Sequence, residues 1–250
     1  MYLLIDAGNS RLKLACHDGQ DWVLRTAVTD LGQLREELPP GFLPSRIVIA
    51  NVAGPRMAEQ LQHNLAGLEA PIEWLQGSKS RCGLHCGYTD PAQLGADRWA
   101  AAIGAWQHIQ SDCVVVCAGT ATTVDVIRAP GCFAGGCILP GFGLMLEALS
   151  TRTAALPRAQ GGLPPETLRQ IPVETQSAIR AGCLHAQLGA IERIAAQLPT
   201  ASPILLAGGF AETLAPHLDA RARLHPWLVM DGLLAIATDS KTNPPMGPKS

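Results

Sequence analysis

The same local pattern occurs twice in this chain: an apolar β run, a short polar turn that contains glycine, and a second β run. In the first copy, residues 2–5 and 12–15 flank the turn Asp6-Ala7-Gly8-Asn9-Ser10. In the second copy, residues 113–117 and 123–127 flank a turn that contains Gly119. Each copy is predicted to form a β-hairpin, with Gly8 and Asn9 adopting the positive φ of a tight turn.

Strands precede helices in both halves of the chain. The expected elements are a strand over 46–52 and helices over about 55–68 and 94–107, then a strand over 134–139, helices over 142–149 and 175–197, and a strand over 204–207. An α/β chain is therefore predicted, with an N-terminal lobe over 1–110 and a C-terminal lobe over 111–240. The tail, 241–250, is rich in Pro, Lys and Ser and is predicted to be disordered.

Composition favours a small soluble ligand. A chain of 250 residues with 47% hydrophobic residues can bury a large core. With 16% charged residues and a net charge of -2, no broad attraction to nucleic acid or to a membrane is expected. The N-terminus has no charged region followed by a long apolar stretch, and no run reaches the roughly 18 apolar residues of a membrane span. A cytoplasmic location is predicted.

Eight cysteines raise the question of metal binding. Cys82 and Cys86 flank His85, and Cys113 and Cys117 form a second pair, which together resemble a four-thiolate zinc pattern. The second pair, however, lies in a probable buried strand, where cysteine packs as a small hydrophobic residue. Structural zinc is therefore not favoured. Thiols of a cytosolic protein stay reduced, so disulfides are not favoured either.

The histidines are scattered singly and form no nucleophile–base pattern. Four of them, His17, His63, His108 and His217, are expected at the surface. No catalytic role is predicted for any of them.

The first turn is suited to phosphate and magnesium. The backbone amides of Gly8, Asn9 and Ser10 can face a phosphate, and Asp6 at the strand end can hold a hydrated magnesium ion. Lys13 can add positive charge. Taken alone, the segment is explained equally well as an ordinary hairpin turn.

Two later segments repeat this design. Gly119 and Thr120 follow a β run, and Thr122, Thr123 and Val124 lead into the next one. The strand over 204–207 ends in two glycines, at 208 and 209, which would let a nucleotide lie close to the backbone. Threonine-rich strands and strand-ending glycines also occur in purely structural roles.

The order of these three segments resembles that of the acetate and sugar kinase, Hsp70 and actin superfamily, and most closely the type III pantothenate kinases, also called the Bvg accessory factor family. The resemblance covers residues 1–239. More specific marks are Gly95-Ala96-Asp97-Arg98, Gly135-Gly136-Cys137-Ile138-Leu139-Pro140-Gly141, Thr153-Ala154-Ala155-Leu156-Pro157, and Glu174-Thr175-Gln176-Ser177-Ala178-Ile179 with Gly182. It implies two ribonuclease H-like lobes, each a mixed β-sheet with flanking helices, in an actin-like ATPase architecture.

The resemblance also implies a reaction: ATP-dependent phosphorylation of pantothenate to 4'-phosphopantothenate, the first step of coenzyme A biosynthesis. Such a transfer needs a carboxylate that takes the proton of the acceptor hydroxyl, and Asp97 matches that residue. Arg98 would bind the carboxylate of pantothenate. The sequence leaves open a second interpretation, a helix N-cap Asp followed by a surface Arg.

Further site residues are carried over from the resemblance. Pantothenate would contact Tyr88, Gly95, Ala96, Asp97 and Arg98, and also Thr175 from a neighbouring subunit. ATP would contact Asp6, Ala7, Gly8, Asn9, Ser10, Arg11, Leu12, Lys13, Gly119 and Thr120, with Mg²⁺ at Asp6. The implied assembly is a homodimer with active sites at its interface, without nucleic acid or membrane partners.

One position departs from the family pattern. Many members have an Asp three residues before the threonine of the Gly-Thr turn, where it binds K⁺ or NH₄⁺, but this chain has Cys117. Thiols are poor ligands for hard monovalent cations. Weak or absent potassium dependence is therefore expected. Asp125 could substitute, although a local structural role explains it equally.

Two alternative functions remain at this point. One is a kinase of another small hydroxylated substrate, because a fold does not determine a substrate. The other is a non-enzymatic, nucleotide-binding accessory or regulatory protein. Asp97 and Arg98 favour an enzyme, and the absence of basic clusters argues against DNA binding.

Overall fold

The computed structural model describes residues 1–28, 31–152 and 170–239. The chain forms two compact units, Met1–His108 with Trp227–Ser250, and Ile109–Pro226. The predicted tail, 241–250, and the segment 153–157 lie outside the described residues.

The first unit is built on a mixed sheet with the strand order β3-β2-β1-β4-β5. Its strands are β1 (Tyr2–Ala7), β2 (Leu12–His17), β3 (Trp22–Val28), β4 (Arg46–Asn51) and β5 (Ile72–Trp74). Two short strands that do not belong to this sheet, β6 (Ser80–Arg81) and β7 (Leu84–Cys86), pair with each other. β1 pairs antiparallel with β2 and parallel with β4. The first predicted hairpin is therefore confirmed. The strands β3, β5, β6 and β7 were not predicted.

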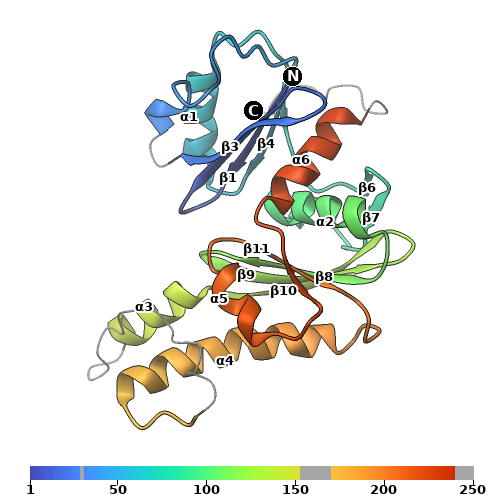
Figure 1. The fold of residues 1–250 in the computed structure, drawn as a ribbon. Helices are drawn as coiled ribbons and strands as arrows, with labels where there is room; N and C mark the ends of the chain where they lie inside the picture. The colour runs from blue at the N-terminus through green and yellow to red at the C-terminus, as the bar shows by residue number, and fades with distance from the viewer. Residues whose placement is uncertain (29–30, 153–169, 240–250) are drawn as a thin grey trace. The chain divides into compact units, whose positions relative to one another are not determined.

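Helices cover both faces of this sheet (Figure 1). The helical segments of the unit are η1 (Leu31–Gln33), α1 (Pro55–Leu65), η2 (Pro91–Gln93), α2 (Ala96–Ile109) and α6 (Leu228–Thr238). Leu61 and Leu65 of α1 pack on the face that carries Leu3, Ile5 and Leu14. Helix α6 contacts β1 and β4. Since side chains alternate along a strand, Asp6 and Lys13 lie on the face opposite to α1.

The position of α6 differs from the expected division of the chain. The sequence prediction assigned residues 111–240 to the second lobe, but α6 packs with the N-terminal strands. Its apolar residues, among them Leu228, Met230, Leu233 and Ile236, are buried. Burial of this apolar face explains why α6 packs against the first sheet although it is distant in sequence.

Helices α2 and α6 cross at two glycines. A Cβ atom added to Gly104 would lie 2.3 Å from the carbonyl oxygen of Leu228, and one added to Gly232 would lie 1.8 Å from that of Ala100. Neither position can therefore hold a side chain without movement of the backbone. This crossing places the start of α2, which carries Asp97, relative to the sheet.

The second unit contains β8 (Cys113–Ala118), β9 (Ala121–Arg128), β10 (Cys132–Pro140), β11 (Ile204–Ala207) and β12 (Ala222–Leu224), in the order β12-β11-β8-β9-β10. β8, β9 and β10 are antiparallel, and β11 runs parallel to β8. The helical segments are α3 (Phe142–Arg152), α4 (Thr175–Ala195), α5 (Ala211–Leu214) and η4 (Ala215–His217). The second hairpin and helix α4 are confirmed; β12 was not predicted.

The core of the second unit lies between its sheet and α4. Val114, Val116 and Val124 of the sheet form one buried cluster with Leu184 and Ile191 of α4. This face holds α4 in place, and Gln187 of the helix in turn contacts Pro140 at the β10–α3 junction.

The cysteines, the histidines and the hydrophobicity of the helices can also be described. The eight cysteines are free thiols, and the described residues include no group of three or more His, Cys, Asp or Glu side chains placed to hold a metal ion. The surface prediction was wrong for His17, which is only 7% exposed and lies edge-on to Trp22. None of the described helices combines the length and hydrophobicity needed to cross a membrane.

Candidate active site

Asp6 and Lys13 face each other at one end of the first sheet. They are direct partners in the antiparallel β1–β2 register. The turn between the strands is closed by the Gly8 amide, which donates to the Arg11 carbonyl over 3.1 Å. Ala7 and Leu12 are buried, whereas Asn9, Ser10 and Arg11 are exposed.

The expected turn geometry was wrong. Neither Gly8 nor Asn9 has a positive φ. A Cβ atom on Gly8 would lie 3.3 Å from the carbonyl oxygen of Arg11. Glycine is therefore explained at this position by close packing in the turn and not by a left-handed backbone conformation.

Burial raises the pKa of Asp6 from 3.8 to about 6. The ammonium group of Lys13 lowers this pKa, and the carboxylate of Asp97 raises it. Burial disfavours the charged form because a carboxylate loses its hydration shell, and a second carboxylate nearby adds repulsion. Asp6, Lys13 and Asp97 thus interact electrostatically within one unit.

A pH-dependent stability follows from this pKa. The folded-state pKa lies above the unfolded one, so protonated Asp6 stabilises the fold fully below about pH 4, and this contribution is lost as the pH rises through about 6. The variant Asp6→Asn is expected to be more stable than the wild type at pH 7, by about 1–3 kcal/mol. Thermal unfolding of both proteins between pH 4 and pH 8 checks this. A difference that does not change with pH would contradict it.

Asp97 lies in the first turn of α2. Its Oδ1 accepts a hydrogen bond from the Arg98 amide at 2.8 Å. The partial positive charge at a helix N-terminus stabilises such a carboxylate. A Cβ atom on Gly95 would lie 2.8 Å from this Oδ1, so glycine at that position leaves room for the carboxylate. The sequence predicted the residue, and the helix start explains its orientation.

Arg98 is buried rather than exposed, with 5% of its surface accessible. Its Nη1 donates to the Tyr88 hydroxyl at 2.9 Å, and its guanidinium carbon lies 5.7 Å from the centroid of the Tyr88 ring. The interpretation of this segment as an N-cap Asp with a surface Arg is therefore wrong for Arg98. Buried guanidinium groups are costly, which favours a functional reason for this one.

The second turn, at Gly119 and Thr120, is held by close backbone packing. The Gly119 amide donates to the Ala121 carbonyl at 3.0 Å, and the Gly141 amide donates to the Thr120 carbonyl at 2.9 Å. A Cβ atom on Gly141 would lie 2.1 Å from the carbonyl oxygen of Gly119. Gly119 and Thr120 are exposed, so the turn can meet a ligand.

Gly208 packs against the chain's own backbone. It has a φ of +94°, and a Cβ atom there would lie 2.3 Å from the carbonyl oxygen of Ala118. The structure thus explains this glycine by the chain's own backbone, next to the Gly119 turn. Phe210 donates its amide to the same Ala118 carbonyl, and its ring stacks on Phe142 at 4.5 Å.

Sequence reasoning missed Phe142, Phe210 and Gln187. Gln187 on α4 is fully buried, and its Nε2 donates to the Pro140 carbonyl at 2.7 Å. Pro140 precedes Gly141, which bonds to the turn at Thr120. The sequence offered one sign of this contact: a glutamine on the otherwise apolar face of a predicted helix.

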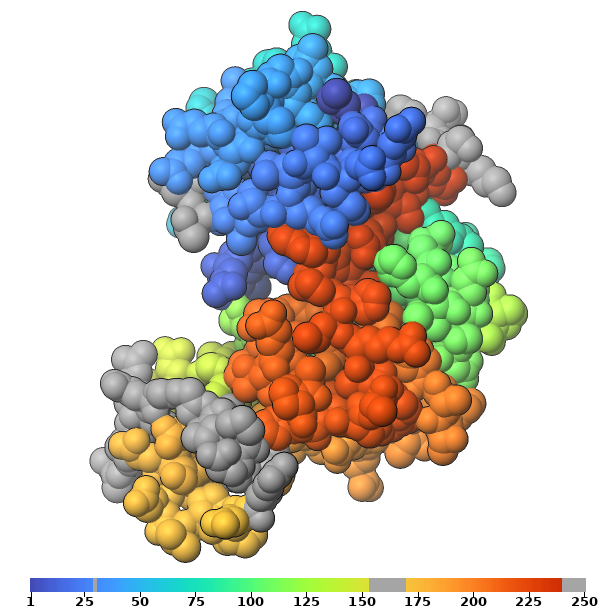
Figure 2. Space-filling model, in the orientation of Figure 1, coloured from blue at the N-terminus to red at the C-terminus, as the bar shows by residue number. Residues whose placement is uncertain are grey.

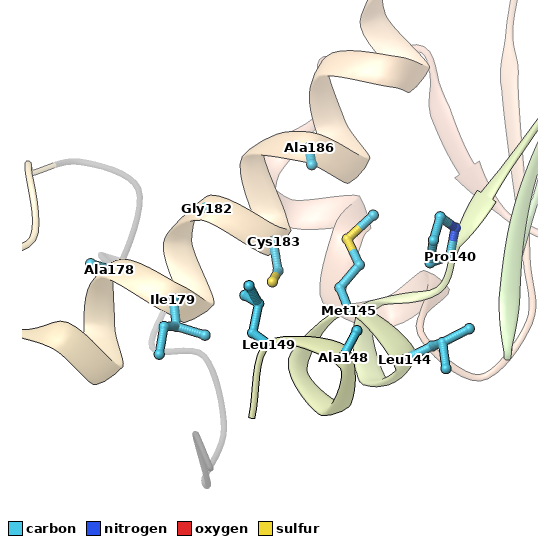
Figure 3. Close-up of a pocket in the computed structure, with 10 residues that line it drawn as sticks. All are labelled: Pro140, Leu144, Met145, Ala148, Leu149, Ala178, Ile179, Gly182, Cys183 and Ala186. Atoms are coloured by element: carbon cyan, nitrogen blue, oxygen red, sulfur yellow. The ribbon is translucent and has the colours of Figure 1, made fainter. Parts of the chain in front are cut away.

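Thr175 is the first residue of α4 and is exposed. Near it, an apolar groove runs between α3 and α4, with a volume of about 610 Å³. Figure 3 shows Met145 and Leu149 of α3 facing Ile179 and Cys183 of α4 across this groove.

The structure therefore groups the predicted residues in two sets. The first unit holds Asp6, Lys13, Asp97 and the Tyr88–Arg98 pair. The second unit holds Gly119, Thr120 and Thr175.

Comparison with known proteins decides the family. The model of the type III pantothenate kinase family matches residues 2–197. The chain belongs to this family. Type III pantothenate kinases from Dechloromonas aromatica and Aromatoleum aromaticum are 41% and 43% identical to it, over 96% of this chain and 100% and 98% of theirs.

Solved structures confirm the predicted fold class. A Baf family transcriptional activator from Campylobacter jejuni matches with a TM-score of 0.62 and 25% identity, over 94% of this chain and 96% of that one. A 2-dehydro-3-deoxygalactonokinase protein from Sinorhizobium meliloti matches with a TM-score of 0.61 and 17% identity, over 95% and 98%. This member of the family has the actin-like kinase architecture, with two mixed sheets and flanking helices.

Proposed function

We propose that this pantothenate kinase transfers the γ-phosphoryl group of ATP to the primary hydroxyl of pantothenate through the residues of its first sheet and of helix α2. The observation that carries this assignment is the grouping of Asp6, Lys13 and Asp97, with buried Arg98 next to Asp97 in sequence. Two carboxylates and two cations in one unit offer a base, a metal ligand, a phosphate ligand and a carboxylate ligand.

Each group has a distinct role in the proposal. Asp97 accepts the proton of the attacking hydroxyl, and the backbone amide of Arg98 orients the Asp97 carboxylate. Arg98, held against Tyr88, binds the carboxylate of pantothenate. Lys13, the backbone amides of Asn9 and Ser10, and Thr120 bind phosphate oxygens. Alignment of the hydroxyl with the γ-phosphate then accounts for most of the rate.

The residues at the end of β1 also fit Mg²⁺. Carboxylate oxygen is the ligand that Mg²⁺ prefers, and Asp6 provides one. The repulsion between Asp6 and Asp97, which raises the pKa of Asp6, would be relieved by a divalent cation. When bound, Mg²⁺ neutralises charge on the nucleotide phosphates. Asp6 is the residue we assign to it.

A direct assay tests the activity and its cation requirement. The purified chain with Mg-ATP and pantothenate is expected to yield 4'-phosphopantothenate, with and without added K⁺ at similar rates, because Cys117 replaces the usual Asp. If ATP is consumed with another hydroxylated substrate but not with pantothenate, the chain is a kinase of that other substrate. Nucleotide binding without any turnover would indicate an accessory protein. A strict requirement for K⁺ would contradict the inference from Cys117.

A homodimer is part of the proposal. The apolar groove between α3 and α4 and the exposed Ile171 and Val173 just before α4 support an interface at this surface, next to Thr175. If Thr175 completes the site of a partner chain, mixing inactive Asp97→Asn and Thr175→Ala proteins should give more activity than either alone. No gain in the mixture would contradict a shared site. We expect the enzyme to work in the cytoplasm.

A further inference from the structure

One tryptophan contacts two cations of the first sheet. The Nζ atom of Lys13 lies 5.4 Å from the centroid of the Trp227 ring, and the guanidinium carbon of Arg25 lies 5.9 Å from a Trp227 ring centroid. Both distances are within the range of cation–π attraction, which is about 6 Å. No sequence motif includes Trp227 or Arg25.

The strand register explains why these two cations share a ring. Lys13 pairs with Ala27, and Ala15 pairs with Arg25, in the antiparallel β2–β3 ladder. Lys13 and Ala15 are two residues apart, so their side chains and those of their partners point to the same face. Lys13 and Arg25 are therefore diagonal neighbours on the face opposite to α1. This is also the face that carries Asp6.

The position of Trp227 is fixed by α6. Trp227 is the N-cap residue of this helix, and its carbonyl accepts the Asp231 amide at 3.0 Å. At the other end of α6, Nη1 of Arg46 donates to the Ala237 carbonyl at 3.1 Å. Figure 2 shows atoms of α6 (red) next to atoms of the first strands (blue). The ring is thus presented by a helix that is held at both ends.

An aromatic ring can hold a lysine without adding a negative charge. The face of the ring attracts an ammonium group through its quadrupole, whereas each further carboxylate would add a full negative charge beside it. A long, flexible lysine side chain otherwise loses conformational freedom each time it binds a phosphate. Holding Lys13 in advance reduces this loss.

We propose that Trp227 is a positioning residue for Lys13: it holds the ammonium group beside Asp6, where Lys13 binds the phosphates of ATP. This inference rests on the proposed function, in which Lys13 is a phosphate ligand. Arg25 contacts the same ring, and the proposal assigns it no contact with phosphate.

The test measures nucleotide binding and turnover in a graded series at Trp227. Because cation–π attraction is strongest for Trp and weaker for Tyr and Phe, the Kd for Mg-ADP is expected to rise in the order wild type, Trp227→Tyr, Trp227→Phe, Trp227→Leu. We expect a rise of about 3- to 30-fold for Trp227→Leu, from a stabilisation of about 0.5–2 kcal/mol. The KM for pantothenate should change less than about two-fold. Arg25→Gln is the matched control and should bind Mg-ADP like the wild type.

A double-mutant cycle separates positioning from general structure. In a Lys13→Met background, Trp227→Leu is expected to leave the Kd for Mg-ADP unchanged, because the side chain that it positions is gone. An equal loss in both backgrounds, or an unchanged Kd for Trp227→Leu, would overturn the inference. If Trp227→Leu does not fold, the Tyr and Phe variants give the same comparison. A wild-type chain that binds no nucleotide would overturn the proposed function itself, and the inference with it.

Discussion

Replacing Asp97 with asparagine is expected to lower kcat for pantothenate phosphorylation by about 10²- to 10⁴-fold. The amide keeps the size of the side chain but does not take a proton from the attacking hydroxyl. Because the carboxylate of Asp97 also raises the pKa of Asp6, this substitution should lower the pKa of Asp6. Steady-state kinetics with both substrates measure the first effect, and the pH dependence of unfolding measures the second.

Asp90→Asn is the matched control for this variant. Asp90 is exposed and accepts the Ala92 amide at 3.1 Å, a bond that asparagine can also accept. Its kcat should remain within about two-fold of the wild type. Near-normal turnover by Asp97→Asn would exclude Asp97 as the base, whereas an equal loss in Asp90→Asn would point to a general effect of charge in this segment.

Gly232→Ala is expected to be the most destabilising of the substitutions considered, by about 2–4 kcal/mol. The added Cβ atom would lie 1.8 Å from the Ala100 carbonyl oxygen and 3.0 Å from the Gly104 amide nitrogen, so α2 and α6 must move apart. Both atoms that it would meet belong to backbone, which cannot rotate away as a flexible side chain can. Apolar contacts along α6 would be lost with the separation.

Tryptophan fluorescence can measure the unfolding of the first unit. All five, Trp22, Trp74, Trp99, Trp106 and Trp227, belong to the first unit. Tryptophan fluorescence during denaturant unfolding therefore reports on the unit that contains the crossing of α2 and α6. An unchanged midpoint for Gly232→Ala would contradict the close packing of these helices.

Gly189→Ala is the control for a helical glycine. Gly189 lies in α4, and a Cβ atom there would meet nothing within 4 Å. Since alanine favours helix more than glycine does, this variant is expected to gain about 0.5–1 kcal/mol, measured by far-UV circular dichroism. The two glycines thus have opposite expected effects, for reasons that only their surroundings explain.

Local sequence signals predicted much of the fold. Both hairpins and the helices α1, α2 and α4 follow from alternation, helical spacing and turn residues, all of which act within a few positions of the chain. Strand β3 was missed because it is a half-exposed edge strand with Arg25 and Thr26 in it, which breaks the apolar run. The ordered motifs were sufficient for the family and for the candidate residues Asp97 and Arg98.

The two hairpins, the order of the glycine-containing segments and membership of the pantothenate kinase family follow from the amino-acid sequence, because each depends on neighbouring residues. Tertiary structure decided that α6 packs with the first sheet, that Arg98 is buried against Tyr88, and that Trp227 contacts Lys13. Trp227 and Lys13 are far apart in the chain, and no local propensity relates them. Only the burial of the apolar face of α6 against the sheet brings them together.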